Sequence, residues 1–466
     1  MRLHGCFFGI MDTQKIKLFL NDVPYRAIWE LVWPQTATML CMIVISLTDI
    51  YVGGKINSEV QASIGISAQL HALFMVLGTS IGAGAMAAVS QSMGAKRFAR
   101  AKRYSGFVLV YAFCMAVLLA VIGYCFRYFI MEILQVEHRM VETAVTFFTF
   151  VLFTLPFQYT HYLSSVLFRA TKEVIKPLLI IIVIAFFNIF GDFAFGLGYF
   201  GFTAWGGKGI AFSTWLSYAL GAVIALIALY RNDIFEKYVI PRFRWMKKAT
   251  PYLFKVSIPA LTMQFLWQLG YLILFAIVAA LPDSVSALAG LTAGMRIESI
   301  LFMPAVAFNA TASILIGSTL GAGKKEEAKK IGLAIIFFGT ILMSTIGLCM
   351  LPFVDTLAGF FSSDADAQWN IRMYVYINIV STPFTVGGLI VNGIMVGAGA
   401  TVYALFINPL CIWGIRLPLG IFLAHILGYG SIGVYFAMLL SMSIQATSMF
   451  MIFLKANWTR HTLRKI

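Results

Sequence analysis

The chain has 466 residues, of which 60% are hydrophobic and 11% are charged. Soluble domains carry about 25% charged residues, so this composition excludes an ordinary soluble protein and requires lipid as the solvent for much of the surface. The net charge of +15 would also suit a nucleic-acid-binding protein, but the basic residues lie in short scattered loops, which argues against that class.

Apolar segments long enough to cross a membrane follow one another along the whole chain. A spanning helix needs about 20 apolar residues. Twelve segments meet this length: 28–52, 64–90, 104–126, 141–166, 174–198, 208–230, 250–281, 286–318, 329–352, 370–395, 402–426 and 431–455. A membrane barrel would instead show alternating segments of about ten residues. We therefore predict an all-α polytopic membrane protein with twelve transmembrane helices and no soluble catalytic domain.

Two basic loops, one after the second span and one after the eighth, repeat nearly the same sequence. Residues 92–103 align with residues 319–330 at an offset of 227, which pairs Gly94 with Gly321. Glycine readily adopts the left-handed backbone that ends a helix, so we expect these two glycines to be helix caps. Because each copy has an even number of spans, the sequence predicts two six-helix lobes related as parallel repeats.

The repeat divides the chain into two lobes, a linker and two tails. The parts are an N-terminal segment 1–27, a first lobe 28–230, a basic linker 231–249, a second lobe 250–455 and a tail 456–466. Lys and Arg concentrate in the tails, the linker and the two repeated loops, all of which lie on the same side of the membrane. Cytoplasmic segments carry this excess, so we predict that both termini are cytoplasmic. The same charges would contact anionic lipids.

Few acidic residues lie inside the spans, where each costs about 2.5–3.5 kcal/mol or more. Asp49 lies near the end of the first span, and Asn188 and Asp192 share one face of the fifth because they are four residues apart. Two neighbouring carboxylates would share a proton or hold Na⁺ through oxygen ligands, with Asn188 adding an oxygen or an amide donor. The alternative is that each acid lies near a lipid–water interface and is simply solvated.

Other charged and helix-breaking residues in the spans carry less information. Glu298 follows Arg296 by two residues in the eighth span, so their side chains do not face each other directly. A lone histidine, such as His71, is typical of core or interface positions. Four prolines within or at the edge of spans are candidates for helix kinks: Pro34, Pro259, Pro304 and Pro383.

The sequence lacks the motifs of nucleotide-driven or hydrolytic chemistry. It contains no P-loop, HExxH or GxSxG motif and no zinc-type spacing. Its six cysteines include no CxxC pair. We therefore predict that the protein is not an enzyme and has no cofactor, with H⁺ or Na⁺ as a coupling ion.

Along nearly its whole length the chain resembles the MATE (multidrug and toxic compound extrusion) family, part of the MOP flippase superfamily. The resemblance rests on five segments, DIYVGG at 49–54, QSMGA at 91–95, NIFGDFAFG at 188–196, GSTLGAG at 317–323 and RLP at 416–418. It implies twelve helices in two lobes and export of organic cations or amphiphilic drugs driven by H⁺ or Na⁺. The expected location is the plasma (inner) membrane of a bacterium or archaeon.

In the DinF-like branch of this family, the resemblance implies a coupling site in the first lobe. The Asp of its first span matches Asp49, and the Asn and Asp of its fifth span match Asn188 and Asp192. A hydroxyl of its sixth span corresponds to Thr214 or Ser213. Asp49, Asn188, Asp192 and Thr214 are therefore the predicted ion-coupling residues, and the first three are the predicted ligands if the ion is Na⁺.

The NorM-like branch adds two carboxylates in the second lobe, at positions that fall at Trp267 and Thr385 here, so a cation site in that lobe is not expected. We predict a secondary multidrug efflux antiporter that works by alternating access as a monomer. Its partners would be small cationic or amphiphilic molecules and membrane lipids, without nucleic acid. The alternative is a flippase for lipids or lipid-linked oligosaccharides, for which Arg296 and Arg416, deep in the spans, offer the cationic groups.

Overall fold

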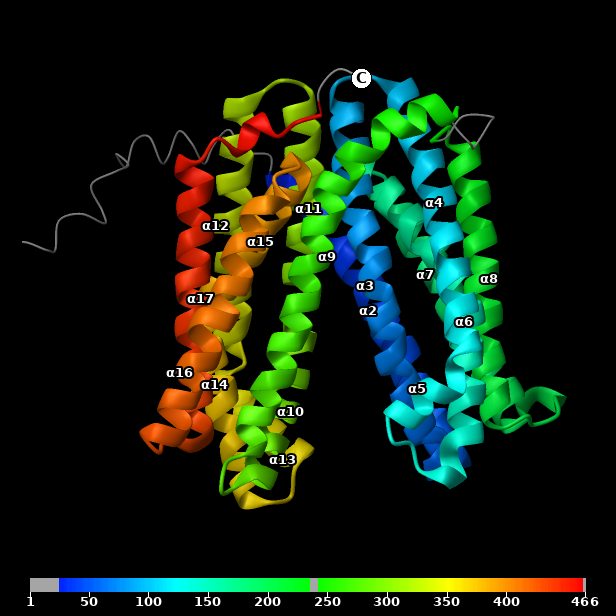
Figure 1. Ribbon diagram of the computed structural model, residues 1–466, viewed down its shortest axis with the longest axis vertical. Coiled ribbons are helices and arrows are strands. Elements are labelled where there is room, and N and C mark those ends of the chain that lie inside the picture. The colour runs from blue at the N-terminus through cyan, green and yellow to red at the C-terminus, as the bar shows by residue number, and fades with distance from the viewer. Residues whose placement is uncertain (1–24, 235–241, 464–466) are drawn as a thin grey trace, which may run out of the picture.

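The computed structural model describes residues 25–234 and 242–463, and Figure 1 shows it as two bundles of helices. No β-strand occurs in the described residues. Within them, twelve helical segments are long and apolar enough to cross a membrane, which confirms the predicted all-α fold. The predicted segments 1–27, 231–249 and 456–466 lie partly outside the described residues.

The first bundle, on the right in Figure 1, contains the first six spans. Its elements are α2 (Tyr25–Ile56), α3 (Ser58–Gly94), α4 (Phe98–Cys125), α5 (Arg127–Ile133), η1 (His138–Met140), α6 (Val141–Ala170), α7 (Ile175–Gly191), η2 (Asp192–Gly196), η3 (Tyr199–Gly201) and α8 (Gly207–Arg231). Local capping helps to set these bounds. The Asn57 side chain, for example, accepts a hydrogen bond of 2.7 Å from the Val60 amide at the start of α3.

The second bundle, on the left in Figure 1, contains the other six spans. Its elements are α9 (Phe243–Ala279), α10 (Ser284–Leu301), α11 (Met303–Gly321), α12 (Lys325–Cys349), η4 (Leu351–Phe353), α13 (Val354–Phe361), α14 (Ala365–Ala398), α15 (Thr401–Cys411), η5 (Ile412–Arg416), α16 (Leu417–Ile421), η6 (Phe422–Ile426), α17 (Gly430–Lys455) and η7 (Trp458–Arg460). Helix α9 begins seven residues before the predicted span, so the end of the predicted linker is helical.

The eighth predicted span, 286–318, is two helices rather than one. Helix α10 ends at Leu301 and α11 begins at Met303, with Pro304 in its first turn. Proline lacks an amide hydrogen and is tolerated at the start of a helix, so Pro304 is the proline that marks a helix break. The other three prolines lie inside continuous helices: Pro34, Pro259 and Pro383.

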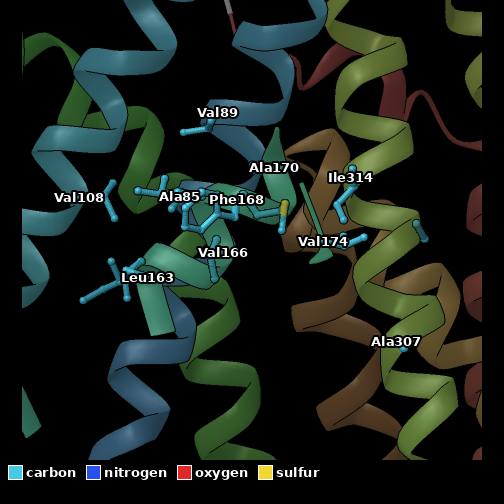
Figure 2. Close-up of a cluster of buried hydrophobic side chains, with 14 of the residues drawn as sticks. Ala85, Val89, Val108, Leu163, Val166, Phe168, Ala170, Val174, Ala307 and Ile314 are labelled. Carbon is cyan, nitrogen blue, oxygen red and sulfur yellow. The ribbon is translucent and has the colours of Figure 1, made fainter. Parts of the chain in front are cut away.

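The two bundles meet at the end of the molecule where the described C-terminus lies, and they separate toward the other end (Figure 1). At the junction, α3 packs on α9 and α11, and α2 packs on α11. Gln35 Nε2 donates a hydrogen bond of 3.0 Å to Thr311 Oγ1 across it. The main hydrophobic cluster continues across the same junction from Val89 to Ile314 (Figure 2). Apolar packing and buried polar bonds therefore close this end.

The repeated glycines allow α3 and α11 to cross closely, and the capping role predicted for them is wrong. A Cβ atom at Gly94 would lie 1.8 Å from a backbone oxygen of α11, and one at Gly321 would lie 2.1 Å from a backbone oxygen of α3. The left-handed residues are instead Lys96 and Gly323, with φ of 56° and 80°. The repeat therefore encodes a matched helix crossing, followed two residues later by a left-handed turn.

Candidate functional site

The fifth span carries two buried polar residues where its α-helix changes into a π-helical turn. Helix α7 ends at Gly191, and Asp192 opens the turn η2. Both Asn188 and Asp192 are 0% exposed. The turn packs against α2 and α8, and a Cβ atom at Gly191 would lie 2.4 Å from Ser213 Oγ. Turns of this kind are frequent at functional sites, and this one directs Asp192 into the interior of the first lobe.

Two hydroxyls of the sixth span hold Asn188 in place. Ser213 Oγ donates a hydrogen bond of 2.8 Å to the Asn188 carbonyl oxygen. The Asn188 amide, Nδ2, donates one of 3.2 Å to Thr214 Oγ1, which itself donates to the Ile210 carbonyl at 3.1 Å. Both hydroxyls considered from the sequence thus contact Asn188, and Thr214 contacts its side chain. The Asn188 amide nitrogen therefore donates to Thr214, and the Asn188 side-chain oxygen has no hydrogen-bond partner among the described residues.

Asp49 brings its carboxyl group to the same place from α2. Its side chain interacts with those of Asp192 and Asn188. Among the described residues, no hydrogen bond of ordinary geometry reaches Asp49 Oδ1, Asn188 Oδ1 or either carboxyl oxygen of Asp192, although all four atoms are buried. Buried oxygens without donors are rare in folded proteins and call for an explanation. A cation or protons shared among them would supply the missing interactions.

A cavity of about 310 Å³ opens beside this cluster in the first lobe. Asp49 and Thr214 line it, whereas Asp192 is not among the lining residues. Asp49 therefore lies between the cavity and the buried Asp192. The described residues that line the cavity include aromatic and aliphatic side chains of α2, α3, α6 and α8, such as Phe147, and no Lys or Arg. The arrangement suits an apolar ligand with positive charge.

A histidine and a glutamine that were not predicted as site residues also line the cavity. His71 Nε2 lies 2.7 Å from Gln158 Oε1, and both side chains face the same space as Asp49. The sequence analysis assigned His71 to a core or interface position. A lone histidine gives no signal by itself, and the relevant contact joins α3 to α6, 87 residues apart in the chain. Only the fold places His71 beside the acidic cluster.

The second lobe places uncharged groups at the position equivalent to this site. Asn408 follows Asn188 by 220 residues, and the π-helical turn η5 follows η2 by the same offset, with Ile412 in place of Asp192. Asn408 Nδ2 donates to Asn392 Oδ1 at 3.2 Å, and Gln445 Nε2 donates to Asn408 Oδ1 at 3.0 Å. Within the described residues, the hydrogen bonds at the equivalent site therefore join amide side chains and include no carboxylate.

Comparisons with known proteins agree with this architecture. The MatE family model matches residues 34–194 and 259–422. The probable multidrug resistance protein NorM of Thermotoga maritima is 27% identical over 305 residues, which is 64% of this chain and 64% of that protein. The probable multidrug resistance protein YoeA of Bacillus subtilis is 22% identical over 82% of this chain and 83% of that protein.

Solved structures show the same fold at low sequence identity. The crystal structure of the Vibrio cholerae MATE transporter VcmN in the bent form aligns with a TM-score of 0.86 and 18% identity. The alignment covers 97% of this chain and 100% of that chain. The family model covers both lobes, so its match is not confined to one half. The chain therefore belongs to the MatE family of multi-pass membrane transporters.

Proposed function

We propose that the protein is a secondary multidrug efflux antiporter that exchanges H⁺ or Na⁺ for an organic cation or amphiphile. The observation that carries this proposal is the pair of neighbouring carboxyl groups, Asp49 and Asp192. Asp49 borders the cavity and Asp192 is fully buried. Asp49 Oδ1 and both carboxyl oxygens of Asp192 lack hydrogen-bond donors among the described residues. A carboxylate inside a membrane is expensive and usually marks an ion or substrate pathway.

The coupling ion reaches the site through the cavity. Asp49 takes up the cation first and shares it with Asp192, and Asn188 stays oriented because Thr214 accepts from its amide. Asp49, Asp192 and Asn188 each have a side-chain oxygen without a hydrogen-bond donor among the described residues. These oxygens could bind Na⁺, which prefers oxygen ligands, and the two carboxyl groups could equally bind protons. With the cation bound, the negative charge beside the cavity falls. A positively charged ligand that relied on that charge is then released.

Alternating access follows from the way the bundles meet. We place the closed end on the cytoplasmic side, because the basic repeated loops lie there and cytoplasmic loops are rich in Lys and Arg. The described conformation is then closed inside and open outside. Rocking one lobe against the other would open the opposite end. The DinF-like assignment rests on the carboxylates of the first lobe, together with Trp267 and Thr385 in place of acids in the second.

The cavity composition favours an organic cation over the phosphate of a lipid-linked sugar. Among the described residues, the cavity lining has an acid, Asp49, and no Lys or Arg. Of the two arginines that would support a flippase, Arg416 is 1% exposed beneath aromatic rings, and Arg296 is exposed on α10. In the described part of the chain, neither arginine lines the cavity beside Asp49 or the small cavity beside Glu298.

Ethidium accumulation in cells tests this function. We expect cells that express Asp49→Asn or Asp192→Asn to accumulate as much dye as cells without the transporter. The control is Asp366→Asn, which makes the same change in an exposed residue in the first turn of α14 and should export normally. Export at the wild-type rate by both site variants, at equal expression, would rule out the assignment.

A further inference from the structure

The second lobe contains a half-buried acid, Glu298, and a buried base, Arg416, that the proposed coupling mechanism does not use. Glu298 lies on α10, four residues before the break at Phe302 that precedes α11, and Arg416 is the last residue of the π-helical turn η5. Both lie inside the predicted spans, 286–318 and 402–426. Ionisable residues at that depth are functional-site candidates by default.

The Glu298 carboxyl group faces a small polar cavity. The Tyr374 hydroxyl of α14 donates a hydrogen bond to Glu298 Oε2, and Asn378, one turn further along α14, interacts with the same carboxyl group. These three residues and Tyr435 of α17 line a cavity of about 20 Å³. One water molecule fits such a volume when polar partners surround it. The Tyr435 hydroxyl interacts with Ser431 but forms no hydrogen bond of ordinary geometry among the described residues, so it can donate to that water.

Arg416 is close to Glu298 without forming a salt bridge with it. Its Nε donates a hydrogen bond of 2.9 Å to Ser441 Oγ, and its guanidinium lies 5.4 Å from the ring centre of Trp267 and 5.6 Å from that of Tyr271. Its Nη1 and Nη2 atoms are buried and form no hydrogen bond of ordinary geometry among the described residues, although the Arg416 side chain interacts with that of Tyr271. Glu298 and Arg416 interact electrostatically, but no ion pair within 4 Å joins them in the described part of the chain.

This geometry differs from that of a static structural ion pair. A buried pair that serves only stability needs direct contact and full hydrogen bonding to offset the loss of hydration. Here the Tyr374 hydroxyl donates a hydrogen bond to the Glu298 carboxyl group, and a cavity that fits one water molecule adjoins that group. The Nη1 and Nη2 atoms of Arg416 form no hydrogen bond of ordinary geometry among the described residues. Both charges also lie beside helix irregularities, the break at Phe302 and the turn η5. Such irregularities are places where helices bend.

We propose that Glu298 is a second proton-exchange site, in the second lobe, and that Arg416 is its internal counter-charge. This inference rests on the proposed antiport function and adds an ion-binding residue to it. A hydronium ion that reaches the small cavity gives its proton to the Glu298 carboxylate: its O–H bond breaks, an O–H bond forms on the carboxyl group, and a water molecule remains. Release reverses this step and returns the proton to water. When the proton leaves, Arg416 compensates the negative charge; when it binds, Arg416 is unpaired, as in the described conformation.

Few other ionisable groups surround this site. From the elements packed against Glu298, the described titratable or charged groups that face it are Tyr374 of α14, Tyr271 of α9 and Arg416 of η5, with Tyr435 of α17 at the same cavity. Tyr271 interacts with both Glu298 and Arg416. None of these described neighbours carries a carboxyl group. An infrared carboxyl band from this site can therefore be assigned to Glu298.

Difference infrared spectroscopy of the full-length protein in liposomes, on stepping the pH, tests the inference without requiring a substrate. Protonation of a carboxylate creates a C=O stretching band. We expect one such band to be absent in Glu298→Gln and present in Glu142→Gln, which makes the same change on an exposed turn of α6. Glu298→Asp should restore a band at a shifted frequency. An unchanged set of bands in Glu298→Gln would overturn the proposal.

Arg416 provides an independent check. Without its counter-charge, Glu298 should stay protonated, so Arg416→Gln should lose the same pH-dependent band as Glu298→Gln, and the double variant should show no further loss. A band that persists unchanged in Arg416→Gln would contradict the role of Arg416. The two proposals fail separately: normal ethidium export by Asp49→Asn and Asp192→Asn would overturn the antiport site, whereas an unaltered Glu298 band would overturn only this inference.

Discussion

The coupling proposal depends on which buried atoms have partners and which do not. The Asn188 amide nitrogen is occupied by Thr214, while its oxygen and both Asp192 oxygens are unoccupied among the described residues. An unpaired buried polar group costs about 1–3 kcal/mol. The cluster therefore has unsatisfied hydrogen-bonding groups without a cation, and the proposed binding of H⁺ or Na⁺ would relieve that cost.

Replacing Thr214 with valine should weaken transport by removing the acceptor that orients Asn188. A hydrogen bond of this kind contributes about 0.5–1.5 kcal/mol, so we expect a roughly 2- to 10-fold loss in the rate of gradient-driven ethidium transport. Thr146→Val is the matched control, because Thr146 bonds only to its own helix among the described residues, 2.8 Å from the Glu142 carbonyl on α6. Equal rates for the two variants would contradict the role given to Thr214.

The sequence was informative about the acids and silent about their neighbours. Asp49, Asn188 and Asp192 could be predicted because a polar side chain inside an apolar span costs free energy and is therefore uncommon there. His71 and Gln158 could not, because each is unremarkable in its own helix and acquires meaning only where α3 meets α6. The same holds for the free Nη atoms of Arg416, which depend on how three other helices pack around it.

At the scale of helices, the length of the apolar segments predicted where the spans lie but did not predict where their helices are irregular. All twelve spans were found from apolar length alone. The π-helical turns that begin at Asp192 and Ile412 leave no local signal, because they add one residue to a helical turn without needing Gly or Pro. The break before α11 had a signal in Pro304, but three other prolines sit in unbroken helices, so proline alone does not identify the break.

Substituting Ala at Gly94 or Gly321 should destabilise the closed end of the molecule. The added methyl group would overlap a backbone oxygen of the facing helix, which cannot move aside as a side chain would. Overpacking of this kind costs about 1–3 kcal/mol. We expect a lower melting temperature in detergent for both variants. The control is Gly359→Ala on α13, where nothing lies within 4 Å of the added carbon. A melting temperature that is unchanged at all three positions would contradict the close crossing of α3 and α11.

At the scale of the whole molecule, a single glutamine joins the two lobes and the C-terminal tail. Gln91 Nε2 donates to the Gly397 carbonyl at 2.8 Å. Its Oε1 accepts from the Tyr252 hydroxyl at 3.0 Å and from the Leu463 amide at 2.7 Å. All three partners belong to the second half of the chain. Gln91 is therefore placed to hold the proposed cytoplasmic end shut.

Removing these bonds with Gln91→Ala should shift the population toward conformations that are open at that end. Three bonds at about 0.5–1.5 kcal/mol each are enough to change a two-state population by more than tenfold. The distance distribution between spin labels at Phe98 and Lys325, the first residues of α4 and α12, should gain a longer component. Gln61→Ala, an exposed change elsewhere on α3, is the control. Identical distributions in both variants would show that Gln91 is not a latch.

The most direct test of the account is ethidium transport in proteoliposomes under a Na⁺ gradient and, separately, a pH gradient. The account predicts that at least one gradient drives uphill transport by the wild-type protein and by Asp366→Asn. It predicts that neither gradient drives transport by Asp49→Asn or Asp192→Asn. Uphill transport at the wild-type rate by either site variant, or wild-type transport indifferent to both gradients, would contradict it.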